Sequence, residues 1–139
     1  MGEEAMVESQ VTDAIALIKK LDSDGAAPTF AVWYFYDDDT AWRLIIAGPA
    51  FDALLPKQEA IAYRKIVEVM AASSLSSLTI SDLKLVRTDN PLPLALRSLV
   101  GTAPDGVVRA HFTDTSLMGF FIKEMIVLRS AQSASPRAA

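Results

Sequence analysis

Residues 30–47 constrain the fold of this chain more than any other segment. They read Phe-Ala-Val-Trp-Tyr-Phe-Tyr, then Asp-Asp-Asp-Thr-Ala, then Trp-Arg-Leu-Ile-Ile-Ala. Aromatic and β-branched residues fill both apolar runs and an acidic segment separates them, which predicts a β-hairpin. A small antiparallel sheet normally shows one polar face to water, but both faces of this hairpin carry apolar side chains. We therefore expect another element of this chain, or another molecule, to cover the outer face.

The length of the turn decides which residues share a face of the hairpin. With a two-residue turn at residues 38 and 39, Phe35 pairs with Trp42. Trp33 and Leu44 form the next pair on the same face, which we assign to the core. A four-residue loop keeps these faces, whereas a three-residue loop would change the pairing. In the favoured register the opposite, outer face carries Val32, Tyr34, Tyr36, Arg43 and Ile45.

Two longer segments have the apolar spacing of helices. Apolar residues recur every three or four positions from Glu3 to about Leu21, and the segment 22–25 ends this first helix with a glycine. Pro56 suits the first turn of a second helix, which we expect to run to about Ala72. The buried stripe expected on the second helix consists of Ala60, Tyr63, Val67, Met70 and Ala71.

The rest of the chain predicts shorter elements. A third strand is expected near residues 83–87, and residues 94–99 suit a short helix. Two late apolar segments, 107–112 and 117–128, indicate an antiparallel pair of strands joined by a turn at residues 113–116. Gly119 then falls inside the longer strand, where we interpret it as a bulge.

These elements predict an α+β fold. We expect a two-layer arrangement, with an antiparallel or mixed sheet of about four to six strands and two main helices packed on one face. A single domain is expected over residues 1–129, because a length of 139 residues suits one compact core. Small and polar residues fill positions 130–139, which predicts a disordered C-terminal tail.

The composition limits the classes of function. The longest uninterrupted apolar run is the seven residues 30–36, whereas a helix that crosses a membrane needs about 20. The chain has no cysteine and its first residues lack the order of a signal peptide, so we expect a cytoplasmic protein without a membrane partner. Its net charge of −4 and its scattered Lys and Arg residues argue against binding of nucleic acid through phosphates.

The densest polar cluster is Asp37, Asp38 and Asp39. Carboxylate oxygens bind Mg²⁺ and Ca²⁺, but consecutive strand residues point to opposite sides and three in a row do not converge on one ion. Asp also forms turns readily, and we favour a solvated turn here. The alternative is a metal-dependent hydrolase or nuclease, in which these acids act together with a distant acid such as Asp52, Asp82 or Glu124.

Signatures of catalysis are missing elsewhere in the sequence. His111 is the only histidine, and on its strand it falls on the same side as Arg109, which predicts a surface position. The chain contains no Gly-x-Ser-x-Gly elbow and no glycine-rich loop for phosphate. We therefore expect a protein without catalytic activity and without a cofactor.

The outer face of the hairpin is the remaining candidate site. Tyr and Arg anchor many protein interfaces, and aromatic side chains on a sheet also stack the bases of single-stranded nucleic acid. Alternatively, the segment 93–99 or the loop around Phe51 could cover this face internally. We predict a small binding domain that forms a homodimer, or binds another protein, through Tyr34, Tyr36, Arg43 and Ile45.

Overall fold

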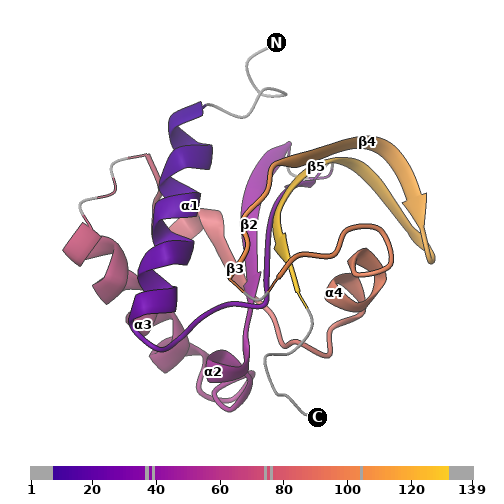
Figure 1. Cartoon of the computed structure of the whole chain (residues 1–139). Coiled ribbons are helices and arrows are strands. Elements are labelled where there is room, and N and C mark those ends of the chain that lie inside the picture. The colour runs from indigo at the N-terminus through magenta and orange to yellow at the C-terminus, as the bar shows by residue number, and fades with distance from the viewer. Residues whose placement is uncertain are drawn as a thin grey trace.

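The core of the fold is a five-stranded mixed sheet with strand order β3-β2-β1-β5-β4 (Figure 1). The structure, a computed structural model, describes residues 8–36, 38, 40–73, 75, 77–103 and 105–131. Within them, the antiparallel strands are β1 (Phe30–Tyr36), β2 (Ala41–Ala47), β4 (Ala110–Leu117) and β5 (Phe120–Ser130). The short strand β3 (Leu83–Leu85) runs parallel to β2. The mixed sheet and its helices confirm the predicted α+β fold.

Both long helices pack on one face of the sheet, as predicted. They are α1 (Glu8–Ser23) and α3 (Glu59–Ser73), which contact each other (Figure 1). Leu17 and Ile18 of α1 are fully buried, as is Ile66 of α3, and they share one cluster with Trp33 and Leu44 of the sheet. The predicted start of the first helix, at residues 3–7, lies outside the described residues.

The short helix α4 (Pro91–Leu96) covers part of the opposite face of the sheet (Figure 1). Asn90 caps it by accepting a hydrogen bond from the Leu92 backbone N–H at 3.0 Å, and Pro91 occupies the first turn, where its missing N–H costs nothing. Leu92 and Leu96 are buried against the sheet in a second apolar cluster. Internal cover of the outer face, one of the alternatives raised by the sequence, is therefore present over part of that face.

The buried side of α3 differs from the predicted stripe. Ala62, Ile66 and Val69 are buried, while the predicted Ala60, Val67 and Ala71 are exposed and Tyr63 and Met70 are partly buried. The helix carries apolar residues on nearly every side, so their spacing does not select one stripe. The helix begins at Glu59, after an additional short helix α2 (Pro49–Asp52) that the sequence did not predict, and the 3₁₀ turn η2 (Ile80–Asp82) follows it before β3.

The turn between β4 and β5 also lies elsewhere than predicted. Residues 113–116, the predicted turn, belong to β4, and the chain reverses at Met118 and Gly119 instead. Both have positive φ, 46° and 91°, which is the backbone of a tight hairpin turn. Gly119 is therefore the turn residue and not a bulge.

Strand β5 extends past residue 129, the predicted end of the domain. Ser130 ends β5, and its backbone N–H donates to the Thr102 hydroxyl at 3.2 Å. The Ala131 N–H donates to the Thr29 carbonyl at 2.8 Å. Both residues are buried, so the predicted tail begins too early. Its remaining residues, 132–139, lie outside the described residues.

Candidate functional site

The structure confirms the register of the β1–β2 hairpin. Phe35 pairs with Trp42 and Trp33 with Leu44, so the predicted division of the hairpin into two faces is correct. Tyr34 lies directly opposite Arg43. The four predicted interface residues therefore belong to one face of the sheet, the face on which α4 packs.

Ile45 does not contribute to the accessible part of this face. Only 1% of it is exposed, and it belongs to the apolar cluster that contains Val32 together with Leu92 and Leu96 of α4. A side chain buried inside its own folded chain offers no surface to a partner. The prediction of Ile45 as an interface residue is therefore wrong, because α4 lies over the start of β1 and the end of β2 and covers this side chain.

Tyr34 and Tyr36 lie toward the other end of β1 and are only partly buried. Their ring centroids are 4.9 Å apart with the planes tilted by 48°. The Nζ atom of Lys84 lies 5.3 Å from the Tyr36 ring centroid, within the range of a cation–π contact. Burial, and secondly the neighbouring Tyr36, raise the pKa of the Tyr34 hydroxyl. Arg43, the fourth predicted residue, is also partly buried.

Phe121 joins this surface from β5, although no pattern in the sequence indicated it. It is 62% exposed and lines one pocket of about 200 Å³ together with Tyr34, Phe35, Tyr36, Asp38 and Lys123. Ile122, the residue after Phe121, is buried in the same cluster as Met125 and Val127, so the buried positions do not alternate regularly along β5 and strand periodicity gives no signal for Phe121. We call Tyr34, Tyr36 and Phe121 the aromatic surface.

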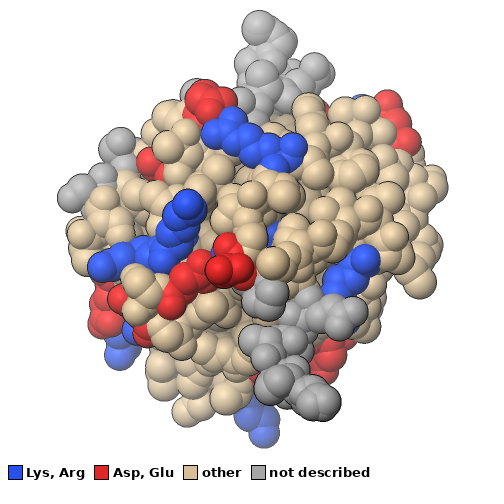
Figure 2. Space-filling view, viewed as in Figure 1, with Lys and Arg blue, Asp and Glu red and all other residues tan. Residues whose placement is uncertain are grey.

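The charged residues in view lie mainly to one side of the molecule. Figure 2 shows Lys, Arg, Asp and Glu gathered over the side where α1 and α3 lie, whereas the side formed by β4 and β5 is largely uncharged. Met118, at the turn between β4 and β5, is 73% exposed and lines a further pocket with Phe121. The tip of this hairpin is therefore apolar and accessible.

The acidic candidates for a metal site are not brought together in the described part of the chain. Asp37 and Asp39 lie outside the described residues, and Asp38 lies at the hairpin turn. Among the described residues no group of three His, Asp or Glu side chains is placed to hold an ion. The distant acids each have a local partner: Asp52 accepts hydrogen bonds from Thr88, Asp82 from Thr79, and Glu124 contacts His111.

His111 lies on the surface, as predicted. Its side chain is 53% exposed, and its Nε2 atom is 2.6 Å from Oε2 of Glu124 on the neighbouring strand. Nearby in sequence, Arg109 forms an ion pair with Glu8 of α1 at 2.8 Å. The first contact connects the edge strand β4 to β5, and the second connects the loop before β4 to α1.

Comparison with known proteins gives no guide to function, since no family model, curated protein or solved structure matches the chain. In the part of the chain that the structure describes, none of the helices has the length and apolar character needed to span a membrane. A functional assignment therefore has to come from the geometry and chemistry of the chain itself.

Proposed function

We propose that this chain is a binding domain that self-associates through the aromatic surface of Tyr34, Tyr36 and Phe121. The observation that carries the proposal is the exposure of Phe121, 62%, beside two partly exposed tyrosines around one pocket. Large apolar side chains that gather in one exposed patch mark interaction sites in soluble proteins. Complete burial of one Phe side chain contributes about 1.5–3 kcal/mol.

Charges at the same pocket favour a second copy of this chain as the partner. Asp38 and Lys123 both line it, so the surface carries one charge of each sign. In a two-fold symmetric dimer the same surface meets itself, which allows Lys123 of each copy to approach Asp38 of the other. A nucleic acid would meet a chain with a net charge of −4. A cytoplasmic location is part of the same proposal, because a chain without cysteine has no need of an oxidising compartment.

The test is the effect of Phe121→Asp on the state of association, measured by sedimentation equilibrium. Loss of the buried Phe is expected to weaken the dimer by at least about 100-fold in Kd, because each dimer loses two contacts of about 1.5–3 kcal/mol each. Ile61→Asp is the matched control, since Ile61 is 45% exposed but belongs to α3 on the opposite face. Circular dichroism checks that both variants fold.

The proposal fails if Phe121→Asp and Ile61→Asp associate as strongly as the wild type. Ile45 is unsuitable for this test, because it is buried and a charge there is expected to cost several kcal/mol of stability. An Ile45→Asp variant would therefore report on the core and not on the interface.

A further inference from the structure

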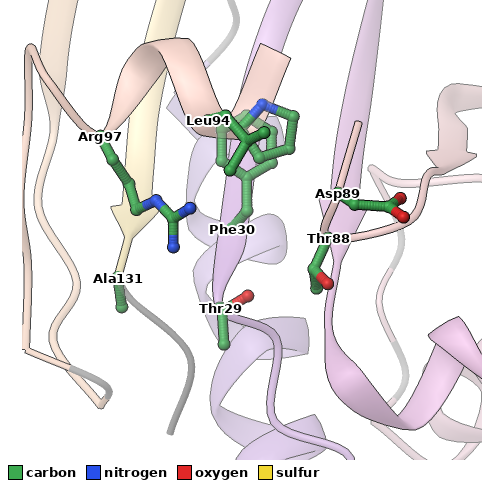
Figure 3. A pocket seen from close by; sticks show the side chains of 8 residues that line it. Thr29, Phe30, Thr88, Asp89, Leu94, Arg97 and Ala131 are labelled. Carbon is green, nitrogen blue, oxygen red and sulfur yellow. The ribbon is translucent and has the colours of Figure 1, made fainter. Parts of the chain in front are cut away.

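A separate pocket, of about 220 Å³, opens at the other end of β1 (Figure 3). It lies where α4, the start of β1 and the end of β5 meet. Its lining residues come from these elements and from the loop before α4: Thr29, Phe30, Thr88, Asp89, Pro93, Leu94, Arg97 and Ala131. It shares no residue with the aromatic surface, so it is a separate candidate site.

The pocket combines apolar walls with hydroxyl groups. Phe30 and Pro93 are buried residues that present apolar surface to it, and Leu94, 47% exposed, forms its outer lip. Thr29 and Thr88 contribute side-chain oxygens, of which the Thr88 hydroxyl donates to Asp52. Apolar walls with a few polar groups are the usual composition of small-molecule sites.

Arg97 supplies a positive charge to this pocket. It is partly buried at the end of α4, and Figure 3 shows its guanidinium extending toward Ala131 and Thr29. Its side chain forms no hydrogen bond or ion pair with the residues that the structure describes. A guanidinium has five donors and binds carboxylates through two parallel hydrogen bonds, so a partly buried one without an anion is suited to receive one.

Asp89, the only acid among the lining residues, does not cancel this charge. It is held by Arg87, whose Nε donates to Oδ1 at 3.1 Å and whose Nη2 donates to Oδ2 at 3.4 Å. In Figure 3 the Asp89 carboxylate points away from Arg97. The Asp89 charge is therefore balanced by its own partner, and a net positive charge remains at Arg97.

We propose that this pocket binds a small amphipathic carboxylate, a molecule with one carboxylate group and a short hydrocarbon part. The carboxylate pairs with Arg97 beside the Thr29 hydroxyl, and the hydrocarbon part packs on Phe30, Pro93 and Leu94. The volume of about 220 Å³ is below the roughly 300–1,000 Å³ of sites for drug-sized ligands, which limits the ligand to a compact molecule. Neither this pocket nor its ligand is part of the proposed self-association.

The first test compares hexanoate with 1-hexanol and hexylamine, three probes of equal chain length that differ in charge. Titration into the full-length protein is followed by amide chemical shifts in heteronuclear NMR spectra. Hexanoate is expected to shift the amides of Thr29, Leu94 and Arg97 in a saturable manner, and to bind at least about tenfold more tightly than 1-hexanol. Equal binding of all three probes, or shifts confined to other residues, would overturn the proposal.

Two variants locate the site on the residues named. Arg97→Gln is expected to weaken hexanoate binding about tenfold or more while leaving 1-hexanol unaffected, because only the charged contact is lost. Arg64→Gln, at an exposed position on α3, makes the same change of charge and should leave hexanoate binding unchanged. Leu94→Ser should weaken both probes by a similar factor. Wild-type affinity for hexanoate in both Arg97→Gln and Leu94→Ser would refute the assignment.

Discussion

The guanidinium of Arg129 donates two parallel hydrogen bonds to the carboxylate of Asp22, from Nη1 to Oδ1 at 2.8 Å and from Nη2 to Oδ2 at 2.9 Å. The Arg129 side chain is fully buried. Its Nε and Nη1 atoms also donate to the backbone carbonyls of Gly106 and Pro28, at 2.8 Å and 3.0 Å. One buried cation therefore joins β5 to the end of α1 and to two loops.

Replacement of Asp22 by Ala should destabilise the fold strongly, because it leaves the buried Arg129 charge without its counter-ion. We expect a loss of about 3 kcal/mol, the lower end of the range for breaking a buried pair, since the Asp22 side chain is 26% exposed. Urea unfolding followed by circular dichroism measures the change. Asp24→Ala, two residues further on at an exposed position, is the control and should cost much less.

The same pair makes a prediction for the double variant. Arg129→Met removes the charge that Asp22→Ala leaves unpaired, so the two changes together should cost less than the sum of the single losses. Additive losses within about 0.5 kcal/mol would show that the two side chains act independently, and would contradict this account of the pair.

The raised pKa of Tyr34 makes stability depend on alkaline pH. Burial is the main cause and Tyr36 the second. Because the pKa is higher in the folded state, the folded chain keeps the Tyr34 proton after the unfolded chain has lost it near its ordinary pKa of 10.0. The contribution of Tyr34 to the free energy of unfolding is therefore complete at pH values below its pKa in the unfolded chain. It is lost as the pH rises through its pKa in the folded chain. Urea unfolding across this window should show a smaller decline for Tyr34→Phe, and identical profiles would contradict the expectation.

Gly119 provides a conformation at the β4–β5 turn that other residues rarely adopt. A Cβ at this position meets no atom within 4 Å, so the cost of Gly119→Ala comes only from its φ of 91° and should be about 1 kcal/mol. Gly101→Ala is the control, because Gly101 has equally open surroundings and is not among the glycines with positive φ. Thermal unfolding that gives equal losses for both variants would argue against the strained turn.

The charges beside the aromatic surface allow a complementation test of the dimer. Lys123→Asp and Asp38→Lys should each weaken self-association, because like charges then meet across the two-fold axis. A mixture of the two variants should associate again, since each Asp at position 123 then faces a Lys at position 38. Sedimentation velocity of the single variants and of the mixture measures this. Failure of the mixture to associate more than either variant alone would contradict the proposed pairing.

The β1–β2 hairpin could be predicted in detail because its signals are local. An acidic turn between two apolar runs defines its position, and a two-residue turn leaves one register in which Phe35 meets Trp42.

The turn of the β4–β5 hairpin was predicted at the wrong residues, because its local signals are ambiguous. Thr113, Asp114 and Ser116 resemble a turn, but β-branched Thr residues also suit a strand, and a Met-Gly pair is a weak turn signal by comparison.

The residues that the sequence pattern did not indicate depend on contacts between distant segments. Asp22 and Arg129 are 107 positions apart, and neither has a local feature that indicates its partner. Phe121 reaches the tyrosines only because β5 pairs with β1 in the sheet. Similarly, the packing of α4 over Ile45 joins two segments that are distant in sequence, and the pattern of residues within β2 does not indicate it. Pairing order in the sheet is thus the information that the sequence alone did not provide.

The most direct measurement of the central claim is the solution mass of the wild-type chain, obtained by size-exclusion chromatography with light scattering over a range of concentrations. Self-association through the aromatic surface predicts a mass that rises toward twice the monomer mass of 15.0 kDa, and a return to the monomer mass in Phe121→Asp. A mass of 15.0 kDa at every concentration would contradict the claim.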